Sequence, residues 1–157
     1  MKKVLFTLLA ALTVTIAAQA QPRSVGATLG YNMNISYQHT VHNADFIETS
    51  LGTAGFESLD LYAGYNFMIA QPNWTSRGEW GFYAGPGLAI GTGFDDGYAF
   101  SLGFTAQVGL EYTFWFPLQL SLDLRPRFGF KTSHNHVSFH ESALYGFTPT
   151  LSIRYRF

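Results

Sequence analysis

Charged side chains in the second half of the chain are the residues best placed to do chemistry. They recur at alternate positions, so on extended strands they would share one face. Buried charges persist when they are paired, because an unpaired one costs several kcal/mol. A shared face of this kind predicts either a salt-bridged interior or the lining of a narrow pore. The set comprises Glu111, Asp123, Arg125, Arg127, Lys131, Arg154 and Arg156, and Asp60 could join it.

Histidines form a second cluster close to the C-terminus. A His-x-His pair with a third ligand can hold zinc or copper. No fixed metal-site spacing is met, and a polar surface loop accounts for the same residues, so we expect neither a metal site nor a cofactor. His39 and His42 could join only if their turn lay at the same end of the molecule. The cluster consists of His134, His136, His140 and Glu141.

Strands must position these residues, because apolar and polar residues alternate along most of the chain. Between Ala99 and Phe114, even-numbered residues are apolar and odd-numbered residues are small or polar. Successive strand side chains point to opposite faces, so this is a strand with one apolar side. Roughly 9–11 residues suffice for a tilted strand to cross a membrane. Six such segments stand out: residues 24–38, 58–69, 79–91, 99–114, 118–131 and 143–157.

A closed barrel needs two more strands than these six segments supply, because small single-chain membrane barrels have even strand numbers from eight upward. We place the missing pair between Asn32 and Gly52, with turns at residues 32–34 and 42–44. The pair then consists of two short strands, residues 35–40 and 45–51. Three prolines lie inside the segments and predict bulges or local bends: Pro86, Pro126 and Pro149.

The first twenty residues are typical of a Sec-type signal peptide. Two lysines precede an apolar run at residues 4–16, and residues 18–20 form a small-x-small cleavage site. We therefore expect residues 1–20 to be removed and residues 21–157 to form one barrel domain. The chain has no cysteine, so it can form no disulfide, and an N-terminal cysteine for lipid attachment is lacking.

The overall composition favours a membrane protein without membrane helices. Charged residues make up 12% of the chain and aromatic residues 17%, whereas a soluble domain is about 25% charged. No stretch beyond the first twenty residues is long and apolar enough for a membrane helix. A closed barrel is then the membrane structure that satisfies its own backbone groups. The net charge of −1 gives no basic patch, so we expect no nucleic-acid partner.

Alternation alone does not tell which face meets lipid, since a soluble barrel turns its apolar face inward. Here the apolar face of residues 99–114 carries no charge, and the polar face is rich in small residues that suit a narrow lumen. We expect an all-β, antiparallel, up-and-down transmembrane β-barrel of eight strands, and a monomer. Aromatic residues near segment ends would form its interfacial girdle: Tyr112, Phe114, Trp115, Phe116, Tyr155 and Phe157.

The C-terminal third carries a family resemblance. Residues 114–126 (FWFPLQLSLDLRP), 128–130 (FGF) and 153–157 (IRYRF) resemble the small outer-membrane β-barrel proteins of Bacteroidetes, which are similar to the OmpX- and OmpA-type eight-stranded barrels of Gram-negative cell envelopes. The resemblance implies an outer-membrane location. It also implies assembly by the outer-membrane insertion machinery, which would read Tyr155 and Phe157. It implies no particular activity.

Three functions remain open at this point. The first is a non-enzymatic barrel with a closed, salt-bridged interior, which serves envelope structure or surface contacts. The second is a narrow porin-like channel for ions or small solutes. The third is a lipid A-modifying enzyme with a Ser–His pair. His136, Ser138 and Glu141 have the residue types, but Phe139 stands where deacylases have Asn and Glu141 is too near. We therefore expect no catalytic residues.

Overall fold

The structure is a computed structural model that describes residues 21–30, 32–53, 58–93, 99–133, 136–141 and 149–157. The signal-peptide prediction for residues 1–20 lies outside these residues. Within them, no helix is long and apolar enough to cross a membrane. The strands are β1 (Gln21–Leu29), β2 (Met33–His42), β3 (Asp45–Thr53), β4 (Ser58–Ala70), β5 (Glu79–Gly93), β6 (Ala99–Thr113), β7 (Leu118–Leu124), β8 (Arg127–Ser133), β9 (His136–Glu141) and β10 (Thr150–Arg156).

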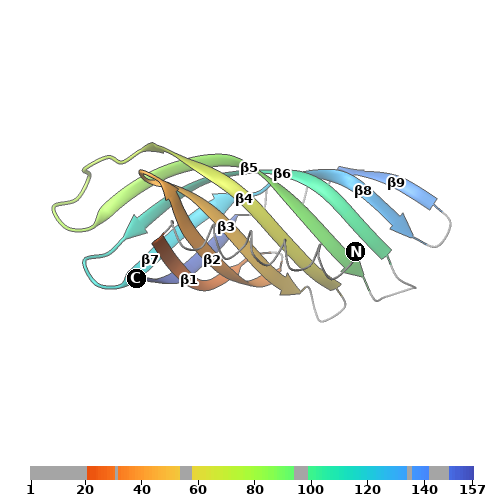
Figure 1. Ribbon diagram of the computed structural model, residues 1–157, viewed down its shortest axis with the longest axis horizontal. Coiled ribbons are helices and arrows are strands. Elements are labelled where there is room, and N and C mark those ends of the chain that lie inside the picture. Colours follow the sequence, from red (N-terminus) through yellow and green to blue (C-terminus); the bar gives the residue numbers. More distant parts are fainter. Residues whose placement is uncertain (1–20, 31, 54–57, 94–98, 134–135, 142–148) are drawn as a thin grey trace, which may run out of the picture.

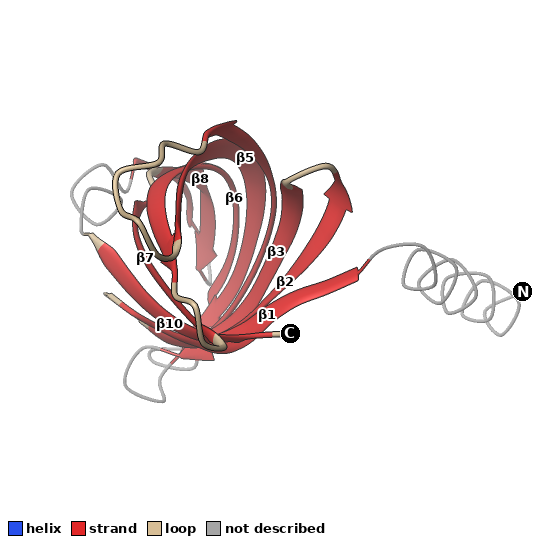
Figure 2. Cartoon of the chain, turned by 90° about the vertical axis from the view of Figure 1, so that its left-hand side faces the viewer, coloured by secondary structure: helices blue, strands red, loops and turns tan. Residues whose placement is uncertain are grey.

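These strands close into an antiparallel barrel of eight, as the sequence predicts. Each of β1 to β6 pairs with its neighbour in sequence, β6 pairs with β7, β7 with β10, and β10 with β1. β8 continues the β7 position along β6, and β9 pairs with β8. Figure 2 shows the ring from the end where β1 begins and β10 ends, which we call the terminal end. Figure 1 shows the strands running obliquely along the long axis.

The predicted inward and outward faces are confirmed at most described strand positions. On β6, Phe104 is 73% exposed, whereas Gln107 is fully buried. On β2, Ile35 is 70% exposed and Gln38 is fully buried. Polar side chains therefore fill the interior and apolar side chains cover the wall. Among the described residues, the buried hydrophobic ones are Phe46, Tyr62, Tyr83 and Ala89.

The predicted extra strand pair is present, with its turns displaced. The first turn is displaced toward the N-terminus, because Met33 already begins β2 and Leu29 ends β1. Between them, the Gly30 amide donates to the Asn32 carbonyl (3.2 Å). The second turn is Asn43–Ala44, and His42 still belongs to β2. Asn43 has a φ of 49°, in the left-handed region that asparagine tolerates better than most residues.

The three prolines behave differently from one another. Pro126 interrupts the segment predicted at residues 118–131, which becomes β7 and β8, while its carbonyl still accepts from the Ala106 amide (3.1 Å). Pro149 lies just before β10. The expectation of a bulge at Pro86 is wrong, because this residue pairs in register with Ala106 inside β5. Between β4 and β5, the backbone pairing is interrupted at Pro86 and resumes in the same register. Such an interruption is expected where a residue lacks an N–H donor.

Gly109 makes room for a buried aromatic ring, which yields a test of the packing. It lies opposite Tyr83 across β5 and β6. A Cβ at Gly109 would overlap the Tyr83 ring and come within 2.8 Å of the Asp123 Cβ. Gly109→Ala should therefore lower the free energy of unfolding by about 1–3 kcal/mol, measured by urea unfolding in detergent. Ala106→Val, on the exposed face of the same strand, should change it by less than about 0.5 kcal/mol; equal losses would contradict the assigned packing.

Candidate functional site

The carboxylate of Glu48, on β3, is the centre of the polar interior. It is fully buried. Its Oε1 accepts hydrogen bonds from Arg125 Nη2 (2.7 Å) and Arg154 Nη2 (2.9 Å). Ser36, Gln38 and Gln107 donate three further hydrogen bonds at 3.1–3.3 Å. In the ring, β3 and β7 are four strands apart, so the pair between Glu48 and Arg125 spans the lumen.

The strand break at Pro126 places Arg125. Arg125 lies between β7 and β8, and its guanidinium joins two carboxylates from different walls. Nε donates to Asp123 Oδ1 (2.6 Å), while Nη2 donates to both Asp123 Oδ2 (3.2 Å) and Glu48. The guanidinium carbon also lies 5.0 Å from the centre of the Tyr62 ring. Arg125 thus fixes the distance between opposite sides of the barrel.

Arg154, on β10, is the second cation of this central cluster. It is 1% exposed. Besides its contact with Glu48, Nε donates to Ser36 Oγ (3.0 Å) and Nη1 donates to Ser121 Oγ (2.7 Å). These partners come from β2, β3 and β7. A single guanidinium therefore ties three strands together inside the barrel.

Aromatic and amide side chains occupy the space beside the central ion pairs. The Tyr62 hydroxyl donates to Gln107 Oε1 (2.8 Å), and the Tyr83 hydroxyl donates to Asp123 Oδ2 (3.1 Å). Phe46 packs edge-on against Tyr83, with ring centres 5.2 Å apart. An eight-stranded barrel is just wide enough for side chains to fill it, and these rings occupy that width.

Ion pairs also cross the lumen on either side of the central cluster. Toward the terminal end, Arg23 on β1 pairs with Glu111 on β6, and Gln119 Nε2 donates to the same carboxylate (2.7 Å). Toward the other end, Arg127 Nη1 contacts Asp60 Oδ1 (3.1 Å), and Asn32 donates to Asp60 Oδ2 (2.9 Å). The lumen is thus bridged at three levels.

The charges of these three levels balance. Four guanidiniums face four carboxylates, and each carboxylate has at least one guanidinium partner. A neutral, paired interior removes the large cost of a buried lone charge. The arrangement also leaves no excess of one sign that would select cations or anions. The cations are Arg23, Arg125, Arg127 and Arg154, and the anions are Glu48, Asp60, Glu111 and Asp123.

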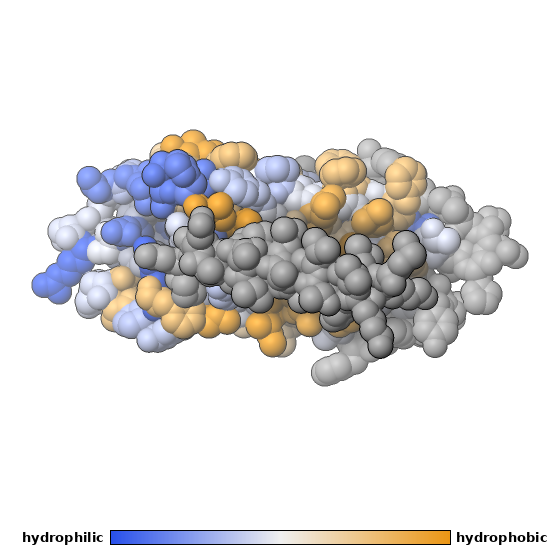
Figure 3. Space-filling model, viewed as in Figure 1, coloured by the Kyte–Doolittle hydropathy of each residue, from blue (hydrophilic) through white to orange (hydrophobic). Residues whose placement is uncertain are grey.

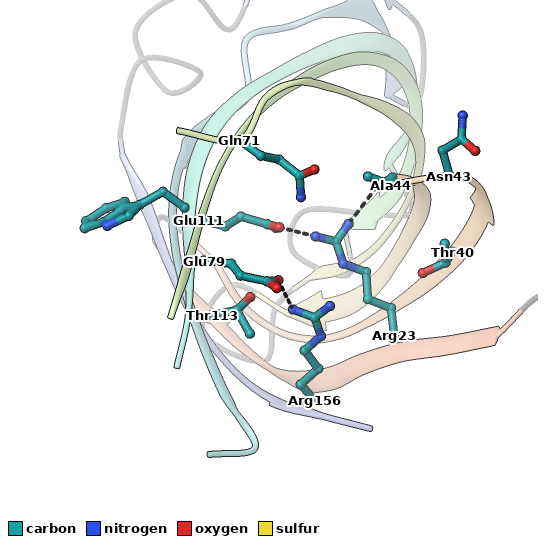
Figure 4. A pocket seen from close by; sticks show the side chains of 10 residues that line it. Arg23, Thr40, Asn43, Ala44, Gln71, Glu79, Glu111, Thr113 and Arg156 are labelled. Atoms are coloured by element: carbon teal, nitrogen blue, oxygen red, sulfur yellow. Dashed lines mark hydrogen bonds and ion pairs between the residues drawn. The ribbon is translucent and has the colours of Figure 1, made fainter. Parts of the chain in front are cut away.

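A polar vestibule of about 200 Å³ opens at the terminal end. Figure 4 shows Arg23 and Glu111 pointing toward each other across it, with Arg156 and Glu79 nearer the rim. The Arg156–Glu79 contact is long (3.4 Å), and both side chains are exposed. The vestibule can hold water or a small polar molecule.

The structure places most of the predicted inward charges inside and corrects others. Lys131 is exposed, because it lies toward the end of β8 beyond the packed lumen. Arg156 pairs with Glu79 at the rim rather than within the lumen. Glu111 and Arg154 share the predicted inward face but form no ion pair with each other, because Glu111 pairs with Arg23 and Arg154 pairs with Glu48. Those found inside as predicted are Asp60, Glu111, Asp123, Arg125, Arg127 and Arg154.

Sequence reasoning missed the acceptor at the centre of the network and the cation beside the terminal end. Glu48 alternates with Phe46, Ser50 and Gly52, which is the signal that could have assigned it inward. Arg23 lies just before the first predicted strand, where the alternating pattern assigns no face.

The candidate metal and catalytic residues near the C-terminus are not among the side chains that the structure describes. His134 lies outside the described residues, and so do the side chains of His136, Ser138, His140 and Glu141. Within the part of the chain that the structure describes, no group of three or more His, Cys, Asp or Glu side chains could hold a metal ion.

Comparison with known proteins adds no family. A scan against protein-family models finds no match, and searches of curated proteins and of solved structures find none either. The resemblance to the small barrels of Bacteroidetes therefore depends on the sequence motifs alone.

The separation of the ion pairs into levels predicts which substitutions are coupled. Glu48→Gln should lower the free energy of unfolding by about 3–5 kcal/mol, because it leaves two buried guanidiniums without their shared anion. A double-mutant cycle of Glu48→Gln and Arg125→Met should show a coupling energy of about 0.5–3 kcal/mol in the free energy of unfolding. The control is Glu111→Gln with Arg125→Met. These two residues share no partner, so their losses should add. Urea unfolding in detergent measures both cycles, and strong coupling only in the control pair would contradict the assigned contacts.

Proposed function

We propose that the chain spans the outer membrane as a monomeric eight-stranded barrel with a closed polar interior, and that it serves a non-enzymatic structural or surface-interaction role. The distribution of apolar residues carries this proposal. Figure 3 shows hydrophobic side chains along the visible wall and hydrophilic ones gathered at the left-hand end. Large apolar side chains that point out from the wall include Ile35, Phe67, Phe104, Val108 and Leu122, each more than half exposed.

Such a wall fits lipid better than water. Soluble monomers rarely expose a contiguous apolar patch larger than a few hundred Å², whereas a membrane barrel requires one. In lipid every backbone polar group needs an internal partner, and a closed ladder supplies it. β5 and β6 each contain 15 residues, more than the roughly 9–11 that a tilted strand needs to cross.

The sequence motifs support the location. The signal-peptide pattern at residues 1–20 fits export by the Sec route, and the C-terminal aromatic residues fit assembly by the outer-membrane insertion machinery. Tyr155 and Phe157 are 55% and 65% exposed, and their rings lie 5.5 Å apart at the outer surface. Both rings thus lie on the outer surface of the barrel rather than in its interior.

A narrow channel for ions or small solutes is the second candidate. It is favoured by the vestibule and by three described residues that are fully buried and keep one polar atom without a hydrogen-bond partner: Asn66 (Oδ1), Gln119 (Oε1) and Ser152 (Oγ). Buried polar groups of this kind are commonly satisfied by water. The closed interior is the stronger proposal, because paired charges bridge the lumen at three levels.

Conductance in planar bilayers separates these two candidates. The purified barrel should insert without a steady open level, because a passing ion would have to break buried pairs such as Arg125–Glu48. The Glu48→Gln variant serves as the comparison. Because it weakens the central cluster, its current should be noisier than that of the wild type. A reproducible open level in the wild type would establish the channel instead.

Deletion of Phe157 tests the membrane location and the assembly signal together. Wild-type protein should fractionate with the outer membrane and resist carbonate extraction. Deleting Phe157 removes an exposed ring and little packing, so it should impair assembly more than stability and leave the protein in the periplasm or degraded. Phe104→Ala, at an exposed ring in mid-wall, is the matched control and should assemble. Wild-type protein in the soluble periplasmic fraction would overturn the proposed function.

A further inference from the structure

Arg77 differs from every other arginine of the chain. All six arginines lie within the described residues, and the five others each contact a carboxylate: Arg23, Arg125, Arg127, Arg154 and Arg156. Arg77 lies in the loop of residues 71–78 between β4 and β5, is exposed, and has no ion pair with any described residue. The Arg77 guanidinium is therefore available to an anion from outside the described chain.

The loop that carries Arg77 is held in place. The Arg77 carbonyl accepts hydrogen bonds from the Tyr112 hydroxyl (2.8 Å) and from Thr75 Oγ1 (2.8 Å). The next residue, Gly78, has a φ of 77°, which glycine adopts without steric cost. The guanidinium carbon lies 5.9 Å from the centre of the Trp115 ring. The cation is therefore presented over an aromatic surface.

That surface belongs to a continuous group of rings, which we call the tryptophan cluster. Neighbouring rings lie 4.6–5.9 Å apart. All three tryptophans of the chain belong to it. The cluster spans β5, β6 and the β4–β5 and β6–β7 connections. It consists of Trp74, Trp80, Phe82, Tyr112, Phe114, Trp115 and Phe116.

The cluster covers one part of the wall. Elsewhere on the outer surface, the ring contacts among the described residues are isolated pairs: Tyr155–Phe157 beside the C-terminus, Tyr37–His39 on β2 and Tyr65–Phe67 on β4. The other two arginines that contact aromatic rings, Arg23 and Arg125, do so inside the lumen. Among the described residues, Arg77 is thus the arginine that combines an exposed guanidinium with an exposed aromatic surface.

We infer that Arg77 and the tryptophan cluster bind the phosphate headgroup of a membrane phospholipid at the terminal end of the barrel. The inference rests on the proposed membrane location. Tryptophan and tyrosine rings favour the boundary between hydrocarbon and headgroups. A guanidinium matches phosphate geometry with paired donors. Trp74 and Trp115 are 59% and 64% exposed, so they offer apolar surface to the glycerol and upper acyl region beside the phosphate.

Tryptophan fluorescence tests this site selectively, because all three tryptophans belong to the cluster. The barrel is reconstituted in phosphatidylcholine vesicles that contain a minor share of phosphatidylglycerol, with bromine on the acyl chains of one lipid at a time. Bromine near the glycerol end should quench more strongly than bromine near the methyl end. Phosphatidylglycerol should be enriched around the tryptophans about fivefold over its bulk share, the effect of one basic residue at a membrane surface.

Two variants assign the enrichment to Arg77. Arg77→Gln should abolish the preference for phosphatidylglycerol while keeping the depth of quenching. Lys131→Gln removes another exposed cation, on β8 away from the cluster, and should keep both. An unchanged preference in Arg77→Gln would overturn the role of Arg77, and quenching mainly by methyl-end bromine would overturn the interfacial site while the membrane location stands.

Two further outcomes distinguish a bound lipid from a free anion and from a barrel outside the membrane. An excess of inorganic phosphate in solution should not abolish the preference for phosphatidylglycerol. If phosphate did abolish this preference, the site would be one for free anions instead. Tryptophans that no brominated lipid quenches would show that the barrel is not inserted, which contradicts the proposed function as well as this site.

Discussion

The buried carboxylate of Glu48 is the interaction on which the interior depends. A carboxylate taken out of water costs several kcal/mol unless opposite charge and hydrogen bonds replace its hydration. Here two guanidiniums and three neutral donors replace it. Because these donors come from β2, β6, β10 and the break between β7 and β8, they hold the walls at a fixed separation. A wider lumen would leave Glu48 without these partners.

Small residues on the inward face make this interior fit. The rings of Tyr62 and Tyr83 are large, so the inward positions next to them must carry small residues. A Cβ at Gly87 would lie 2.7 Å from the Tyr62 ring, and Gly109 gives space to Tyr83. Each of these tyrosine rings therefore packs into the space that a glycine leaves on the neighbouring strand. Polar groups and rings together fill a lumen that is only as wide as eight strands allow.

The sequence was sufficient for the parts of the fold that follow from alternation. Residues 99–113 form a strand with the predicted faces, because a period of two fixes which side chains point inward. The predicted charge at Asp123, on β7, lies inside for the same reason. The partners of the inward charges were not predictable, since contacts across a lumen depend on the strand register around the whole ring.

The alternating pattern gives only a faint signal for the inward position of Glu48. This residue belongs to β3, whose outward face includes Asp45 and Thr49, so the contrast between its faces is weak. Proline chemistry predicted a bulge or local bend at Pro126, and the structure goes further, because the predicted segment divides there into β7 and β8. The consequence of this break, a guanidinium that reaches both Asp123 and Glu48, depends on the position of β3 across the barrel. Local patterns thus define the faces, and closure of the ring determines the network.

The most direct test of the account is the environment of alternate residues along β6. The chain has no cysteine, so single cysteines with a fluorescent label report on individual positions. At Phe104 and Val108, a lipid-soluble nitroxide should quench the label and aqueous iodide should not. At Thr105 and Gln107, the nitroxide should have little effect. Iodide quenching at Phe104 and Val108, without quenching by the nitroxide, would contradict a lipid-facing wall.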